Sequence, residues 1–315
     1  VPQDGRMKMT LSKNHEIDFR VSTLPTQFGE KVVIRVLDSS GAELSLKALG
    51  LEEDQFKLYE EAISKPYGMI LVTGPTGSGK TVSLYSALST LNSPEINISS
   101  VEDPIEINVP GINQVAINER ADLTFAVALR AFLRQDPDVV MVGEIRDLET
   151  ADIAVKASQT GHLVLSTLHT NDAPSTVVRL LNMGVEPFNV ASSVHLIMAQ
   201  RLVRKLCSQC RQPAKHPDEA LIRAGFSPEP DIGEIKIYGP GGCDECTGGY
   251  KGRTGIFQVM PVTEAVSTMI LRDAGQDAIE QQITHEGVLS LRQAGLKKVR
   301  AGITSLEEVL RVTSS

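Results

Sequence analysis

The phosphate-binding loop pattern G-x-x-x-x-G-K-[ST] at residues 74–81 is the feature that most constrains the fold of this 315-residue chain. Residues 69–72 are an apolar, mostly branched run, which is typical of a buried parallel strand. Residues 82–91 carry apolar side chains at helical spacing, so a helix is expected directly after the loop. A chance glycine-rich turn is the alternative, and it is disfavoured because strand, complete motif and helix occur together. The sequence therefore predicts a strand–loop–helix unit that holds phosphate groups.

The residues of this loop have separate expected roles. Backbone N–H groups and the helix N-terminus would hold the β- and γ-phosphates of a nucleotide. Lys80 would supply a mobile positive charge, and the Thr81 hydroxyl would bind Mg²⁺. The predicted nucleotide-binding residues are Gly74, Pro75, Thr76, Gly77, Ser78, Gly79, Lys80 and Thr81.

The composition limits the classes of partner that the chain can bind. The net charge is −8 and aromatic residues make up 4%, with no tryptophan, so a broad nucleic-acid surface is not expected. No apolar run approaches the roughly 18 residues of a membrane-spanning helix, and no signal peptide is visible. We therefore expect a cytoplasmic protein. The chain begins at Val1 without an initiator methionine, which suggests a fragment of a longer protein.

The first 50 residues differ in pattern from the rest. Alternating segments at 16–21 and 31–36, with Pro25 and Gly29 between them, predict antiparallel strands of a small α+β unit within residues 1–38. Residues 39–50 are expected to form a linker, most clearly at 39–42 (Ser-Ser-Gly-Ala).

Residues 51–204 have an α/β pattern. Strands alternate with helices, which predicts a parallel sheet covered on both faces, and ligands of such sheets bind beyond the carboxyl ends of the strands. The other predicted strands are 97–101, 139–142 and 163–165, and the predicted helices are 123–133 and 150–158. Residues 261–315 are expected to form a helical tail with helices at 265–272, 278–284, 289–301 and 305–312.

Polar clusters follow several of these predicted strands. Glu144 comes after 139–142, where Gly143 stands in place of the more usual Asp, and we expect Glu144 to polarise the attacking water; a helix-capping carboxylate is the alternative. Glu102 belongs to the acidic cluster 100–106, which suits a divalent cation, although a solvated turn would be preferred if the cluster stood alone. His169 follows 163–165 and is a candidate γ-phosphate sensor, with a structural hydrogen-bond donor as the alternative.

The cysteines form two C-x-x-C pairs. Two such pairs in a cytoplasmic chain indicate a tetrahedral thiolate site more often than disulfides. We expect a closed, structural Zn²⁺ site within residues 207–246, formed by Cys207, Cys210, Cys243 and Cys246. A redox pair is the alternative, although such motifs normally occur singly. The metal loop would also hold a small basic patch of Arg201, Arg204, Lys205 and Arg211, which is either a membrane-facing surface or a solvated face.

Residues 6–311 resemble the secretion ATPases that drive type II secretion and type IV pilus assembly. The resemblance is carried by the phosphate-binding loop, the acidic box at 100–106, Gly143-Glu144 and the histidine box at 162–169, which occur in that family's order. The most specific phrases are Val-Glu-Asp-Pro-Ile-Glu at 101–106 and Thr-Leu-His-Thr-Asn-Asp at 167–172. The sequence of these motifs is most similar to that of the pilus assembly (extension) motors, with the type II secretion motors next.

The resemblance implies a fold and a mode of action. The fold is a RecA-like P-loop domain at 51–315, preceded by the end of a PAS-like N-terminal domain at 1–38. The action is that of a homohexameric motor that hydrolyses ATP between two lobes and drives an inner-membrane platform protein, without inserting in the membrane. The family match also implies that Arg20 and Arg35 reach the phosphates, although unaided sequence reasoning makes them surface strand residues.

Other functions remain as alternatives at this stage. A retraction motor is disfavoured by the tetracysteine insert, which such motors generally lack. A nucleic-acid translocase is disfavoured by the acidic balance and by the absence of a basic stripe. A scaffold with a dead nucleotide site is disfavoured because Lys80, Thr81 and Glu144 are all present.

Overall fold

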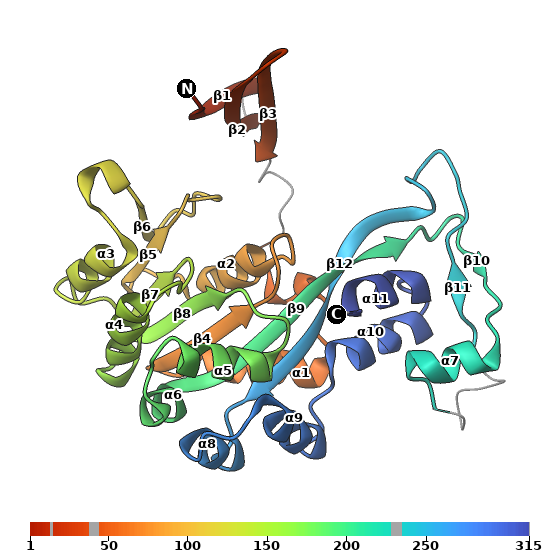
Figure 1. Cartoon of the computed structure of the whole chain (residues 1–315). Coiled ribbons are helices and arrows are strands. Elements are labelled where there is room, and N and C mark those ends of the chain that lie inside the picture. Colours follow the sequence, from red (N-terminus) through yellow and green to blue (C-terminus); the bar gives the residue numbers. More distant parts are fainter. Residues whose placement is uncertain (13–14, 38–43, 228–234, 315) are drawn as a thin grey trace.

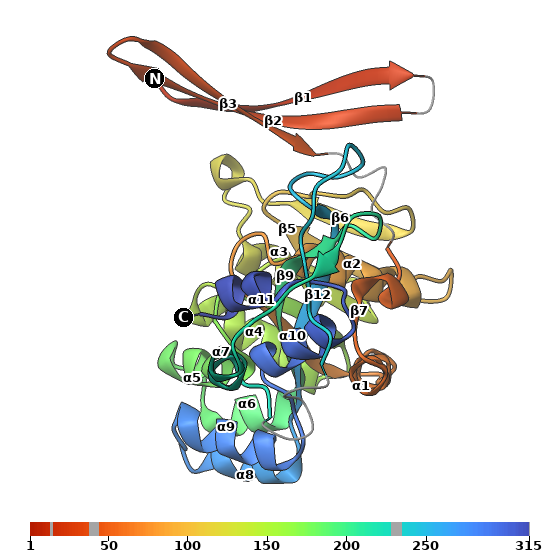
Figure 2. The same ribbon diagram turned by 90° about the vertical axis from the view of Figure 1, so that its right-hand side faces the viewer.

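The N-terminal region folds into an antiparallel sheet, as its alternating pattern predicts. The computed structural model describes residues 1–12, 15–37, 44–227 and 235–314. Strands β1 (Gln3–Ser12), β2 (His15–Thr26) and β3 (Gly29–Leu37) pair in the order β1-β2-β3. This sheet stands apart from the larger α/β body in both views (Figures 1 and 2). Strand β1 was not predicted from the sequence, and the described part of residues 1–37 consists of strands and turns without a helix.

The larger sheet has seven strands, in the order β12-β9-β4-β8-β7-β5-β6, within the described residues. Its strands run parallel except for β12, which pairs antiparallel with β9 at one edge. The strands are β4 (Gly68–Thr73), β5 (Ile98–Glu102), β6 (Ile112–Ala116), β7 (Val139–Val142), β8 (Leu163–Leu168), β9 (Val194–Leu206) and β12 (Tyr250–Pro261).

Helices cover both faces of this sheet (Figure 1). One face packs against the short helix η1 (Leu46–Leu49), α1 (Glu53–Ile63) and α2 (Lys80–Leu91). The core on the other face includes residues of α3 (Phe125–Phe132), α4 (Leu148–Gln159), α5 (Ala173–Asn182), α6 (Pro187–Ser193), α8 (Glu264–Leu271), α9 (Gln276–His285), α10 (Leu291–Arg300) and α11 (Leu306–Thr313). A further short turn, η2 (Glu119–Ala121), precedes α3.

Strand β4 shows why this arrangement follows from the sequence. Successive side chains of a strand point to opposite faces, and Met69 and Leu71 enter one core whereas Ile70 and Val72 enter the other. All six residues of β4 are buried. A continuously apolar strand is therefore required at the centre of the sheet.

The predicted α/β class, with a P-loop sheet core, is confirmed. The strand predicted at 139–142 has the observed bounds, and the predicted helices of the tail are present with ends shifted by one or two residues. Strands β6, β9 and β12 were not predicted. The sheet therefore extends beyond residue 204, because β12 returns to it after the cysteine-bearing segment.

The second half of the linker expected at 39–50 is folded into the α/β body. Residues 39–42 lie outside the described residues. Leu46 and Leu49 are buried in the core against α1 and α2, because their i, i+3 spacing on η1 places both side chains on the same face. The second half of the expected linker thus belongs to the α/β body.

The cysteine-bearing segment lies between β9 and β12. It contains β10 (Gln212–Pro213), β11 (Tyr238–Gly239) and α7 (Asp218–Ala224), and β10 pairs antiparallel with β11. Among the described residues, the helices are all too short or too polar to span a bilayer.

Candidate functional site

The phosphate-binding loop connects β4 to α2, as predicted. Gly74 and Gly79 have φ values of 149° and 92°, in the region that favours glycine. A Cβ on Gly74 would lie 2.6 Å from the backbone oxygen of Gln200, and one on Gly79 would lie 3.0 Å from the Gln200 side-chain nitrogen. Glycine is needed at both positions because the neighbouring strand β9 approaches the loop so closely.

Lys80 is folded back onto its own loop. Its Nζ donates hydrogen bonds to the carbonyl oxygens of Gly74 (2.7 Å) and Pro75 (3.3 Å). Burial lowers the pKa of Lys80, while the nearby Glu144 carboxylate opposes that shift. The ammonium group is therefore held at the mouth of the loop by weak neutral acceptors, which an anionic ligand would outcompete.

A cavity of about 710 Å³ opens beside the loop. This volume falls in the range of ligand sites, roughly 300–1,000 Å³. The cavity lies at the carboxyl ends of β5, β7 and β8, where a ligand of a parallel sheet is expected. The predicted residues that line it are Thr76, Gly77, Ser78, Gly79, Lys80, Thr81, Glu102, Glu144, His169 and Arg35.

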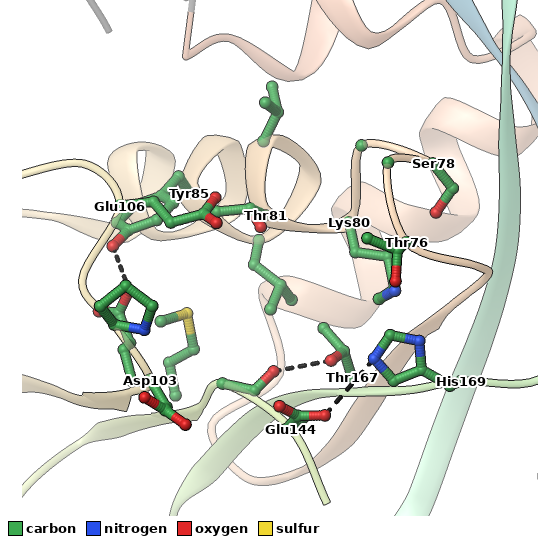
Figure 3. Close-up of a pocket in the computed structure, with 18 of the residues that line it drawn as sticks. Thr76, Ser78, Lys80, Thr81, Tyr85, Asp103, Glu106, Glu144, Thr167 and His169 are labelled. Atoms are coloured by element: carbon green, nitrogen blue, oxygen red, sulfur yellow. Dashed lines mark hydrogen bonds and ion pairs between the residues drawn. The ribbon is translucent and has the colours of Figure 1, made fainter. Parts of the chain in front are cut away.

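Glu144 faces Lys80 and His169 across the cavity (Figure 3). Its side chain is 16% exposed and forms an ion pair with Arg146, and His169 Nε2 lies 3.4 Å from its Oε2. Gly143 comes immediately before Glu144 and bonds to the strands on both sides of β7. The Gly143 N–H donates to the Val101 carbonyl on β5, and the Gly143 carbonyl accepts from Thr167 Oγ1 on β8. A Cβ on Gly143 would lie 3.2 Å from the Val101 oxygen, so a larger residue there would require β5 to move by a few tenths of an ångström.

His169 stands at the carboxyl end of β8, half-exposed. Burial, with the positive charge of Lys80, lowers the pKa of His169, which favours the neutral imidazole. The loop that follows is anchored to the end of β4, because the Thr170 N–H donates to Thr73 Oγ1 at 3.1 Å. This bond joins the histidine box to the strand that carries the phosphate-binding loop.

Glu102 lies at the end of β5 and is buried. Its carboxylate accepts hydrogen bonds from the Tyr85 hydroxyl, from Ser100 Oγ (2.7 Å) and from Gln114 Nε2 (3.3 Å). Burial and the bond to Glu102 raise the pKa of Tyr85. Both oxygens of Glu102 thus have protein donors, whereas Glu144 is the more open of the two predicted carboxylates.

The two predicted arginines lie side by side on the N-terminal sheet. Arg20 on β2 is paired in register with Arg35 on β3, and both side chains are exposed. Arg35 lines the cavity, whereas Arg20 is not among the lining residues. The geometry therefore brings Arg35 to the nucleotide site and places Arg20 one strand away.

The four cysteines converge as their spacing predicts. All four thiols are free, and the sulfur atoms lie within 4.8 Å of one another. Three of the Sγ–Sγ distances are 3.8 Å (Cys207–Cys243), 3.6 Å (Cys210–Cys246) and 3.5 Å (Cys243–Cys246). Tetrahedral zinc with Zn–S bonds of about 2.3 Å needs sulfur separations of about 3.8 Å, so this thiolate set fits Zn²⁺.

The three arginines of the basic patch expected beside the cysteines have partners within the chain, although Arg204, Lys205 and Arg211 are exposed. Arg204 forms an ion pair with Glu308 and stacks on Tyr250. Arg211 donates to the Gly302 carbonyl at 2.7 Å, and Arg201 donates to the Asn171 carbonyl at 2.9 Å. These guanidinium groups hold the C-terminal helices and the loop after β8 in place.

Several lining residues escaped sequence reasoning. Leu202 and Arg253 come from β9 and β12, which were not predicted as strands. Tyr85 lies in α2 at an apolar position of the helical pattern, so its hydroxyl gave no separate signal.

Comparison with known proteins gives consistent matches along the chain. The sequence profile of the family described as "Type II/IV secretion system protein" matches residues 1–311. A "Type IV pilus assembly ATPase PilB" of Pseudomonas aeruginosa is 61% identical over 99% of this chain. A "Type II secretion system protein E" of Aeromonas hydrophila is 51% identical over 99% of the chain. The chain spans 55% and 62% of the lengths of these two relatives.

Solved structures share the fold. The structure described as "Pilus Retraction Motor PilT and Bound ADP" aligns over all of this chain and 78% of its own, with a TM-score of 0.72 and 26% identity. The ATPase DotB of Legionella pneumophila has the same TM-score at 20% identity, which supports the fold only. With the profile matched over nearly its whole length and relatives above 50% identity, the chain belongs to the type II/IV secretion system protein family.

Proposed function

We propose that this chain is the ATP-hydrolysing region of a cytoplasmic motor that powers type IV pilus assembly. The observation that carries the proposal is the single cavity that brings together the phosphate-binding loop, Glu144 and His169. Relatives named type IV pilus assembly ATPases are 54–61% identical to the chain, and relatives named for type II secretion are 48–51% identical. The pilus motor is therefore the first choice and the type II secretion motor the second.

The loop residues would bind the phosphates of ATP. Free N–H groups of the loop and the N-terminus of α2 offer donors to phosphate oxygens. Lys80 Nζ would leave the carbonyls of Gly74 and Pro75 for the β- and γ-phosphates, which are stronger, charged acceptors. ATP binding thus exchanges two neutral hydrogen bonds for charge-assisted ones.

Mg²⁺ is the metal that this site suits. The Thr81 hydroxyl lines the cavity together with the carboxylates of Asp103 and Glu106, and hydroxyl and carboxylate oxygens are ligands that Mg²⁺ accepts. When bound with the nucleotide, Mg²⁺ would neutralise charge that develops on the phosphate oxygens.

Glu144 would orient the water that attacks the γ-phosphorus. The water oxygen forms a bond to phosphorus and gives up a proton, the bond to the β–γ bridging oxygen breaks, and ADP, phosphate and a proton result. Neutral His169 and Arg146 contact the Glu144 carboxylate and would hold its orientation. Glu102 already accepts hydrogen bonds from Tyr85, Ser100 and Gln114. It would therefore contribute by holding Tyr85 in the wall of the cavity rather than by contacting the water.

The motor cycle is proposed from the family. Residues 1–38 would be the end of an N-terminal domain, and residues 51–315 would be the ATPase domain with a zinc subdomain at 207–246 and a helical tail at 261–315. Arg35, followed by Arg20, would approach the phosphates when the two lobes close around ATP. Closure and opening in a homohexamer would move an inner-membrane platform protein, with the ring at the cytoplasmic face of that membrane.

Two measurements test this function. The purified chain should hydrolyse ATP in the presence of Mg²⁺, with turnover that rises with the hexamer population in light scattering. DNA-stimulated turnover by a monomer would favour the nucleic-acid translocase instead.

A chimaera separates the two secretion systems. The corresponding region of a PilB-type and of a type II protein E-type relative would each be replaced by this chain, with an E144Q version as the control. Restored piliation without restored type II secretion is expected, and the reverse would assign the chain to type II secretion.

A further inference from the structure

Gln200 is a buried amide that the nucleotide site described so far does not use. It lies on β9, beside β4 (Figure 1), and is 1% exposed. Its Nε2 donates to the Ser78 carbonyl at 2.7 Å, and its Oε1 accepts from Ser83 Oγ at 2.7 Å. The side chain thus bridges the phosphate-binding loop and helix α2.

The bond to Ser78 fixes the direction of one peptide group. A trans peptide is planar, so its C=O and N–H point in opposite directions. Because Gln200 holds the Ser78 carbonyl towards β9, the Gly79 N–H points the other way, away from β9. That N–H donates to no acceptor among the described residues, and it is therefore free for an anionic ligand.

The amide is suited to this position by its chemistry. A donor is required towards Ser78 and an acceptor towards Ser83, at the end of an unbranched side chain. Glutamate would set an oxygen against the Ser78 carbonyl, and methionine would leave both partners buried and unpaired. Glycine at 74 and 79 gives β9 the close approach on which this contact depends.

We infer that Gln200 is a positioning residue of the nucleotide site, which aims the Gly79 N–H at a phosphate oxygen of a nucleoside di- or triphosphate. The inference rests on the proposed function, since it requires that the loop bind a nucleotide. The hydrogen bond from the Gly79 N–H to phosphate forms when the nucleotide binds, before hydrolysis begins. Loss of Gln200 should therefore weaken the binding of both ADP and ATP, and should affect the rate of hydrolysis less.

The test compares two buried glutamines. Gln258 on the adjacent strand β12 is also 1% exposed, and its Oε1 accepts a hydrogen bond from the Ala173 N–H at 2.8 Å rather than contacting Ser78 or Ser83. Q200M and Q258M remove equivalent amides. The dissociation constants for a fluorescent ADP and for ATP with E144Q in the background would be measured with Mg²⁺, together with melting temperatures and the separate values of kcat and KM.

We expect Q200M to weaken ADP and ATP binding by about tenfold, the scale of one hydrogen bond to a charged group, with KM raised by more than kcat is lowered. Q258M should lower the melting temperature but leave both affinities within about twofold. Equal affinities for Q200M and the unsubstituted chain would overturn the inference. Absence of nucleotide binding by the unsubstituted chain would instead overturn the proposed function.

Ser83→Ala keeps the inference testable where Q200M does not fold. It removes the hydroxyl that anchors the amide oxygen but adds no bulk, so the amide is held only through Ser78. About threefold weaker ADP binding is expected, within the range of one neutral hydrogen bond. Unchanged ADP binding in a folded S83A protein would contradict the inference.

Discussion

Glu308 provides a test of the electrostatics that hold the C-terminal helix in place. Its side chain is 2% exposed and accepts hydrogen bonds from Arg204 (2.6 Å) and Arg311 (3.0 Å), and the backbone N–H of Arg204 adds a third (3.1 Å). Burial raises its pKa, but these donors outweigh burial and bring the pKa from 4.5 to about 2. The carboxylate therefore stabilises the folded chain in its ionised form.

The substitution Glu308→Gln removes that charge with little change of shape. A depression from 4.5 to about 2, at about 1.4 kcal/mol per pKa unit, amounts to about 3 kcal/mol. Solvent screening of the half-exposed arginines reduces this to about 2 to 3 kcal/mol. Because the folded pKa is the lower one, this stabilisation is present above pH 4.5 and is lost as the pH falls towards 2.

The measurement is urea unfolding followed by circular dichroism at pH 7 and at pH 3. The free energy of unfolding of E308Q should lie about 2 to 3 kcal/mol below the unsubstituted value at pH 7, and the gap should fall to about half at pH 3. Glu307→Gln is the control, since Glu307 is 61% exposed and lies 3.7 Å from His216. The reasoning would be refuted by a gap no larger than that of E307Q, or by a gap that does not change with pH.

Three sets of substitutions test the nucleotide site and the cysteine cluster. Glu144→Gln should retain ATP binding and lose turnover by about a hundredfold or more, the scale of a positioned acid–base group; near-normal phosphate release would remove Glu144 from the mechanism. The pair Cys243→Ser and Cys246→Ser should reduce zinc from one per chain and lower the melting temperature while ADP affinity stays within about threefold; a zinc-free parent protein, or an unchanged melting temperature, would contradict the structural-metal site. Arg35→Ala should lower turnover by about tenfold or more, as loss of a charged phosphate contact does, with a smaller effect for Arg20→Ala; equal turnover by R35A and the parent would argue against its role at the phosphates.

The nucleotide loop and the cysteine cluster could be predicted because their chemistry is local. A complete phosphate-loop motif fixes the strand before it and the helix after it. The observed bounds of β4 and α2 agree with the predicted bounds within two residues. Two C-x-x-C pairs likewise specify a thiolate site without knowledge of the path between them. In both cases a few consecutive residues carry the whole signal.

Strands β9 and β12 could not be found in the same way. They are buried near the centre of the sheet but exposed towards its end, so their burial pattern changes from continuous to broken along one strand. Their pairing also joins residues on either side of the whole cysteine-bearing segment, as Gln200 pairs with Phe257. Non-local pairing of this kind leaves no short-range pattern, and so Gln200, Leu202 and Arg253 were missed.

The crowded backbone at Gly143 also bears on how such a site can change during evolution. An aspartate at this position would press its Cβ against the Val101 oxygen and approach the Glu102 Cα, at 3.2 and 3.4 Å. A single substitution towards the more usual arrangement would therefore strain the strand before any new carboxylate became useful. Acceptance of any larger residue at position 143 would therefore require β5 to move by a few tenths of an ångström at Val101 and Glu102.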